Sequence, residues 1–165
     1  MIIAFTSCAE DTRALAASLA EVVQAGDVLL LGGDLGAGKT TFTQGLGRAF
    51  GVDEPITSPT FTLIRQYEGA PGQPRLLHAD VYRLDDLSQV LDLGLAELAE
   101  EGAVAVVEWG ELAAPAFGPN HLEVELSLAD GSDDARLLTF RAVGQAWTGR
   151  VPALRHVLGP WLQTA

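Results

Sequence analysis

Residues 33–40 read Gly-Asp-Leu-Gly-Ala-Gly-Lys-Thr, and this stretch decides the fold of the chain. It has the form G-x-x-x-x-G-K-[ST] of a phosphate-binding loop, whose glycines let the backbone bend around phosphate and present N–H groups to it. Lys39 brings an ammonium to the β- and γ-phosphates, and the Thr40 hydroxyl is a ligand for Mg²⁺. The nucleotide-binding residues that this pattern predicts are Gly36, Ala37, Gly38, Lys39, Thr40 and Thr41.

The sequence on both sides of the loop supports this interpretation. Residues 27–31 form a short apolar run typical of a buried strand, and residues 41–50 form a helical pattern closed by Gly51. A strand, a glycine loop and a helix N-terminus together make an anion site from oriented amides and the helix dipole. A glycine-rich turn with a solvated lysine is the alternative. It does not explain why Lys39 and Thr40 stand together at the start of a helix.

The rest of the chain predicts a mixed sheet with helices. Strands are expected at residues 2–5, 60–67, 75–80, 103–109, 121–128 and 136–143. Helices are expected at residues 12–24 after the capping box Ser7-x-x-Glu10, at 85–101 with a break near Gly94, and at 147–162 with a weak point at Pro152. We therefore predict one α/β domain over residues 1–165, a P-loop NTPase fold with a mixed parallel and antiparallel central sheet flanked by helices.

Composition and charge restrict the possible partners. The 165 residues carry ten Lys and Arg against 22 Asp and Glu, a net charge of −12, which repels a phosphate backbone. We therefore expect no direct, tight nucleic-acid binding by this chain alone and easier contact with basic proteins. The sequence has no apolar run of 18 residues and no secretory signal, so we expect no membrane association and a cytoplasmic location. The lone Cys8 is expected to be a small, at least partly buried side chain rather than a nucleophile.

Two acids at strand ends are candidates to complete a hydrolytic site. Glu108 follows the apolar run of residues 104–107, and Asp80 ends the run of residues 75–79. Either carboxylate could hold Mg²⁺, directly or through water, while the other orients the attacking water. The alternative for each is a strand-end carboxylate that faces solvent. Lys39, Asp80 and Glu108 are the predicted catalytic residues, and which of the two acids joins Thr40 at the metal stays open at this point.

Several other side chains leave two interpretations open. The hydroxyls of residues 57–60 could sense the γ-phosphate or ligate Mg²⁺, or serve the turn around Pro59. For His78, a structural hydrogen-bonded role is the favoured interpretation, and proton transfer is the alternative. Arg83 could neutralise phosphate charge or pair with an acid. For Trp109, packing as an aromatic side chain is favoured over stacking on a base or on a partner.

Taken together, these motifs resemble the TsaE family of bacterial ATPases that serve threonylcarbamoyladenosine modification of tRNA. The matching stretches lie in the family's order between residues 33 and 111, namely residues 33–42, Ser-Pro-Thr-Phe-Thr-Leu at 58–63, His-x-Asp-x-Tyr-Arg-Leu at 78–84, Leu-Gly-Leu at 93–95 and Val-Glu-Trp at 107–109. The phosphate loop is shared with many families, and the other motifs discriminate. Three positions, Ala79, Gly110 and Leu112, depart from the usual pattern without removing a proposed catalytic group.

The resemblance implies ATP and Mg²⁺ as cofactors, with Thr40 and Glu108 near the metal and Asp80 needed for hydrolysis. It implies that residues 9–12 approach the adenine. It also implies TsaD and TsaB proteins as partners, which this chain would drive or reset without transferring the threonylcarbamoyl group itself. Such an ATPase is expected to be weak alone and stimulated by its partners.

Two other functions use the same phosphate loop. A small-molecule kinase would usually carry arginines in a lid over the transferred phosphate, and no Arg-rich segment is visible. A nucleotide-dependent binding switch would not need both Asp80 and Glu108. A preference for GTP is not supported, since the only asparagine is Asn120 and no Asn-Lys-x-Asp motif is present.

Overall fold

A computed structural model describes residues 1–60, 63–109 and 113–163. In this part of the chain, strands form one sheet in the order β1-β7-β6-β2-β5-β4-β3. The strands are β1 (Ile2–Thr6), β2 (Val28–Gly32), β3 (Ile64–Tyr67), β4 (Arg75–Asp80), β5 (Ala103–Glu108), β6 (His121–Leu128) and β7 (Arg136–Val143). The mixed α/β architecture expected from the sequence is therefore confirmed.

The centre of the sheet is parallel and its margins are antiparallel. β6, β2, β5 and β4 run parallel in that order, while β1, β7 and β3 pair antiparallel with their neighbours. Every residue of β5 is buried, as is nearly all of β2, which explains why both sequences are continuous apolar runs. Because parallel strands end at one edge of the sheet, the segments that follow β2, β4 and β5 meet there.

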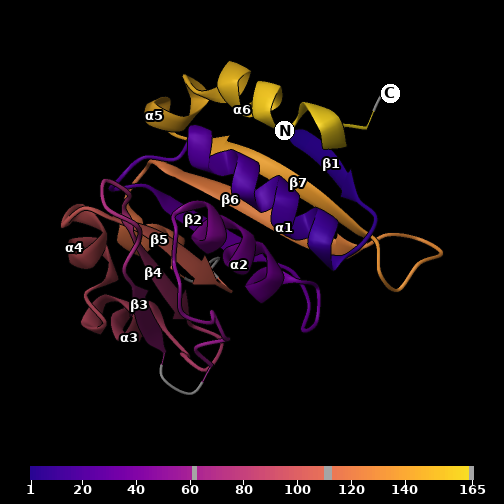
Figure 1. Cartoon of the computed structure of the whole chain (residues 1–165). Helices are drawn as coiled ribbons and strands as arrows, with labels where there is room; N and C mark the ends of the chain where they lie inside the picture. The colour runs from indigo at the N-terminus through magenta and orange to yellow at the C-terminus, as the bar shows by residue number, and fades with distance from the viewer. Residues whose placement is uncertain (61–62, 110–112, 164–165) are drawn as a thin grey trace.

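Helices cover one face of the sheet fully and the other in part (Figure 1). α1 (Ala9–Ser18), η1 (Leu19–Glu21), α2 (Lys39–Ala49) and α6 (Val151–Val157) pack on the first face, with α5 (Gln145–Thr148) and η3 (Gly159–Trp161) beside them. α3 (Leu87–Asp92), α4 (Leu95–Glu100) and η2 (Ala114–Phe117) pack on the second face over β2, β4 and β5. The second face of β1, β6 and β7 is more open, and Ile3, Phe5 and Arg141 on it are exposed.

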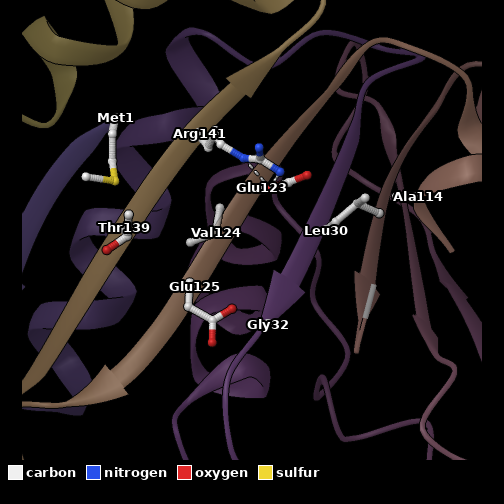
Figure 2. Close-up of a pocket in the computed structure, with 9 residues that line it drawn as sticks. All are labelled: Met1, Leu30, Gly32, Ala114, Glu123, Val124, Glu125, Thr139 and Arg141. Carbon is white, nitrogen blue, oxygen red and sulfur yellow. Dashed lines mark hydrogen bonds and ion pairs between the residues drawn. The ribbon is translucent and has the colours of Figure 1, made fainter. Parts of the chain in front are cut away.

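A cavity of about 550 Å³ opens on this less covered half of the sheet. Figure 2 shows the Arg141 guanidinium paired with Glu123 across β7 and β6, and Glu125 beside Gly32. The residues that line it are Met1, Leu30, Gly32, Ala114, Glu123, Val124, Glu125, Thr139 and Arg141. Lys39 and Thr40 are not among these residues, so this cavity differs from the one that the phosphate loop lines.

The start of the first helix differs from its predicted capping box. The N-cap is Cys8, and the Asp11 carboxylate accepts hydrogen bonds from the Ser7 N–H over 2.8 Å and from the Ser7 hydroxyl over 3.2 Å. Glu10 instead pairs with Arg13 and Arg48 on the surface. The predicted burial of Cys8 is also wrong, since its side chain is exposed.

Two predicted elements are shorter than expected. The strand predicted from residue 60 begins at Ile64, because Leu63 adopts a left-handed conformation with φ of 65° that a strand does not tolerate; Phe61 and Thr62 lie outside the described residues. The terminal helix is divided into α5 and α6, and Pro152 stands in the first turn of α6, where no backbone N–H is needed. No helix in the described ranges is long and apolar enough to span a bilayer.

Candidate nucleotide-binding site

The register of the parallel strands brings the two predicted acids to the phosphate loop. Asp80 at the end of β4 stands opposite Glu108 at the end of β5, and Glu108 stands opposite Leu31 of β2. A cavity of about 470 Å³ lies at this edge. The residues that line it are Leu35, Gly36, Gly38, Lys39, Thr40, Thr41, Ser58, Thr60, Asp80, Tyr82, Glu108 and Trp109. Ala37 is buried and is not among these lining residues.

The loop is shaped by glycine at the point where α2 begins. Gly38 is the N-cap residue of α2 and has φ of 108°, a conformation that residues with a Cβ rarely adopt. The Gly38 carbonyl accepts the first bond of the helix from Phe42, and the Ala37 N–H donates to Asp34 O over 3.0 Å. Main-chain amides of the loop are thus gathered at a helix N-terminus, the arrangement that binds phosphate.

Lys39 is the only lysine in the chain and lies inside the loop. Its ammonium donates hydrogen bonds to the carbonyl oxygens of Gly33, over 2.7 Å, and Asp34, over 2.9 Å. The nitrogen also lies 3.9 Å from the centre of the Trp109 ring, within the range of a cation–π contact. The residue predicted to carry positive charge to the phosphates is therefore held from two sides.

Burial and neighbouring acids act in opposite directions on Lys39. Desolvation lowers the pKa of its ammonium below the ordinary value of 10.5, and this cause is the largest. The charges of Glu108, Asp80, Glu125 and Asp34 raise the pKa and reduce the shift without cancelling it. An anionic ligand in the loop would favour the charged form further.

Thr40, Glu108 and His78 form a connected chain. The Thr40 hydroxyl donates to Glu108 Oε1 over 2.8 Å, and His78 Nε2 lies 2.7 Å from the same oxygen. Because a carboxylate only accepts, the hydrogen of the His78 ring stands on Nε2. His78 is fully buried, which agrees with the predicted structural histidine. The two contacts fix the direction of the Glu108 carboxylate.

Asp80 is held by the loop that follows α2. Its Oδ2 accepts a hydrogen bond from the Thr60 hydroxyl over 3.0 Å, and its Oδ1 accepts one from the Tyr82 N–H over 2.9 Å. The Thr60 and Ser58 hydroxyls lie 2.6 Å apart. Thr57 lies aside, where it accepts a hydrogen bond from Arg65 over 3.0 Å. Asp80 and Glu108 therefore face one cavity but have different partners.

The donor atoms at this site suit a hard cation. The Thr40 hydroxyl and the Glu108 carboxylate supply oxygen ligands of the kind that Mg²⁺ takes. Across the residues that the structure describes, no group of three His, Cys, Asp or Glu side chains forms a metal cage.

Two neighbours of the loop take positions that the sequence does not predict. Trp109, interpreted as a packed aromatic, lines the cavity and contacts Lys39 and the Tyr82 ring, whose centre is 4.9 Å from its own. Arg136 donates to Ala37 O over 2.9 Å although 99 residues separate them. No sequence signal marks that contact.

Other predicted positions stand apart from the cavity. Arg83 is exposed and is not among the described lining residues. Residues 9–12, expected near adenine, are not among them either. The departures from the family pattern at Gly110 and Leu112 lie outside the described residues.

Comparison with known proteins gives one consistent result. A family model described as "Threonylcarbamoyl adenosine biosynthesis protein TsaE" matches residues 6–137. A Bacillus subtilis (strain 168) protein named "tRNA threonylcarbamoyladenosine biosynthesis protein TsaE" is 43% identical over 138 residues, which cover 84% of each chain. The protein of that name from Mycobacterium tuberculosis (strain H37Rv) is 46% identical and covers 79% of this chain and 81% of its own length.

A solved structure extends the likeness to three dimensions. The crystal structure of Bacillus subtilis YdiB superposes with a TM-score of 0.75 at 35% sequence identity. The superposition covers 97% of both chains. The likeness therefore includes the β6–β7 hairpin and the C-terminal helices as well as the phosphate loop.

Proposed function

The chain belongs to the TsaE family, and from this premise we propose that it binds ATP with Mg²⁺ and hydrolyses the ATP in threonylcarbamoyladenosine modification of tRNA. The family and the P-loop fold support a role for a nucleotide in that biosynthesis. The observation that carries the proposal of hydrolysis is the meeting of Lys39, Thr40, Asp80 and Glu108 at one cavity. A site for nucleotide binding alone would not need two carboxylates beside the loop.

In this proposal, the loop and Lys39 hold the triphosphate. Main-chain N–H groups at the start of α2 bind phosphate oxygens, and the helix dipole adds to the attraction. The ammonium of Lys39 lies at the base of the same loop, where it opposes the negative charge that develops during phosphoryl transfer.

The metal would be held by Thr40 and Glu108, whose oxygens already lie 2.8 Å apart. When bound, Mg²⁺ neutralises phosphate charge and orients the phosphates. His78 acts as a positioning residue, because its Nε2–H restrains the Glu108 carboxylate from the buried side.

Asp80 is proposed to orient the attacking water. Its carboxylate lines the cavity and is held by the Thr60 hydroxyl and the Tyr82 N–H, so its direction is set by the segment after α2 and by the chain after β4. A carboxylate fixed in this way accepts a proton or hydrogen bond from water with little reorganisation.

The partners proposed are TsaD and TsaB proteins. The net charge of −12 supports an action on tRNA through proteins rather than by tight direct binding. Since the modification acts on tRNA, the proposal places the chain in the cytoplasm. The chain would drive or reset the transferase complex and would not itself carry the threonylcarbamoyl group.

The experiment is phosphate release from ATP with Mg²⁺, measured for the chain alone and after addition of TsaD and TsaB proteins from the same organism. We expect slow release alone and faster release with both partners, and Lys39→Ala should abolish the stimulated rate. No response to the partners, with ATP still bound, would contradict the proposal and favour a small-molecule kinase. A search for a phosphate acceptor would then follow.

A further inference from the structure

Arg136 joins the β6–β7 hairpin to the outer side of the phosphate loop. Its Nε donates to Ala37 O over 2.9 Å, and its Nη2 lies 3.4 Å from Gly36 O. Its Nη1 donates to Asp133 O over 2.7 Å and to Ala135 O over 2.9 Å, both in the hairpin. These four contacts all end on main-chain carbonyl oxygens. The hairpin therefore orients the guanidinium, and the guanidinium in turn holds the loop.

The contact with Ala37 O sets the direction of an amide that the nucleotide needs. In a trans peptide the C=O and the following N–H point to opposite sides. Arg136 holds the Ala37 carbonyl toward the hairpin, so the Gly38 N–H of the same peptide points away from the hairpin. A carbonyl that turned the other way would present negative partial charge to the phosphates.

The contact with Gly36 O connects Arg136 to Lys39 through the Gly36–Ala37 peptide and the Asp34 carbonyl. Gly36 O accepts from Arg136, and the N–H of the same peptide, on Ala37, donates to Asp34 O. Asp34 O also accepts from the Lys39 ammonium over 2.9 Å. The bond from Arg136 polarises the Gly36–Ala37 peptide and makes the Ala37 N–H a stronger donor to Asp34 O, the oxygen that also accepts from Lys39. Arg136 outside the loop and Lys39 inside it are thus parts of one network.

We propose that Arg136 is a positioning residue for ATP: it holds the Ala37 carbonyl outward, so that the Gly38 N–H faces the phosphates, and it holds the Gly36 carbonyl outward, so that the Ala37 N–H keeps its bond to Asp34 O. The proposal rests on the proposed binding of ATP. It assigns to the β6–β7 hairpin a function in ligand affinity, because Arg136 bonds to hairpin carbonyls and loop carbonyls at once.

The test compares Arg136→Met, which keeps the length of the side chain without its donors, with Arg136→Lys, which keeps the charge without the planar fork. Isothermal titration calorimetry gives the Kd of ATP and of inorganic tripolyphosphate. We expect Arg136→Met to weaken both by roughly 10- to 100-fold, the effect of losing a hydrogen bond from a charged donor. Arg136→Lys should recover part of the loss. In ATP hydrolysis the KM should rise more than kcat falls, since the loop holds the ground state and the transition state alike.

Arg141→Met is the matched control. Arg141 lies in β7, as Arg136 does, but its guanidinium pairs with Glu123 at the cavity shown in Figure 2. Both Arg141 and Glu123 lie outside the phosphate loop. We expect it to leave the Kd of ATP unchanged. Thermal unfolding without nucleotide should be similar for all variants, whereas stabilisation by ATP should be smaller for Arg136→Met.

Wild-type ATP affinity in Arg136→Met would overturn the inference. The inference would also be overturned if both Arg136 variants lost ATP affinity and the unfolding temperature of both fell to the same extent, since that result indicates support of the fold alone. If the unsubstituted chain itself binds no ATP, the proposed function fails, and that outcome is distinct from both.

Discussion

The two sides of the phosphate loop differ in the kind of contact they make. On the β5 side, side chains meet side chains, and Glu108 accepts a hydrogen bond from Thr40 while Asp80 accepts one from Thr60. On the β6 side, the contacts reach the main chain of the loop, through Arg136 and through the Leu126 carbonyl packed against Gly33. In the proposed function, the first side supplies groups for hydrolysis, and the second holds the shape of the loop.

The same difference appears in the electrostatics. The first two acids that act on the pKa of Lys39 are Glu108 and Asp80 on the β5 side. On the β6 side a cation, Arg136, bonds to loop carbonyls, and Glu125 of β6 acts on the pKa of Lys39 after those two acids. Substitutions on the β5 side should therefore change the rate of hydrolysis, whereas on the β6 side loss of the Arg136 donors should change ATP affinity and a side chain at Gly33 should change stability. Four predictions test this division.

The largest effect is expected for Lys39→Ala. The substitution removes the positive charge at the base of the loop and both hydrogen bonds to Gly33 and Asp34 carbonyls, so productive ATP binding should be lost. Calorimetric titration with ATP and phosphate release measure this loss. Arg141→Ala serves as the control for removal of a cation elsewhere. Normal ATP turnover by Lys39→Ala would rule out the assigned site.

Glu108→Gln should lower hydrolysis more than binding. Glutamine keeps the shape and one oxygen acceptor for Thr40 and His78 but removes the charge near the proposed metal. Loss of one preorganised electrostatic contact typically lowers kcat by about 10²- to 10³-fold. The measurement is kcat together with the Kd of ATP.

Glu123→Gln on the less covered half of the sheet is the matched control and should leave both values unchanged. An equal fall of binding and rate in Glu108→Gln would instead indicate a structural role for Glu108.

On the β6 side, Gly33→Ala should destabilise the fold more than Gly36→Ala. Both glycines have positive φ, 122° and 81°, so both substitutions introduce backbone strain. A Cβ on Gly33 would lie 2.2 Å from Leu126 O, whereas one on Gly36 would meet no described atom within 4 Å. We expect the clash to cost about 1–3 kcal/mol of unfolding free energy beyond the shared strain. Urea denaturation measures the difference, and equal losses would show that the hairpin does not constrain Gly33.

The smallest effect concerns pH and Lys39. Burial lowers the pKa of its ammonium below 10.5, so the unfolded chain binds more protons than the folded chain between the lowered value and 10.5. Lys39 therefore makes stability rise with pH in that window. ATP favours the charged form, so ATP binding should take up protons and weaken as pH rises through the lowered pKa.

Reductive ¹³C-methylation gives a direct measurement, because the chain has a single lysine and its ε-methyl signal is unique. A titration midpoint at or above 10.5 would contradict the prediction. Lys39→Arg, whose charge does not titrate in this range, should remove the alkaline weakening if it still binds ATP.

The parts of the site that sequence could predict are those whose signal is local. The glycines, Lys39 and Thr40 occupy eight consecutive positions, and the apolar runs before Asp80 and Glu108 mark buried strands that end in acids. Such patterns identify elements because the side-chain period and the chain breakers act over a few residues. They left open which acid stands beside Thr40.

The tertiary structure decided which elements became neighbours of the loop. The strand order β6-β2-β5-β4 places Glu108 against Thr40, while Asp80 contacts Thr60. The same fold brings the Trp109 ring to Lys39. It also brings Arg136 to Ala37, although 99 residues separate them. A strand's own residues show that it is buried but not which strand lies beside it. That choice depends on long-range packing of both sheet faces, so the sequence by itself determined the chemical groups of this protein, and only the fold decided their contacts.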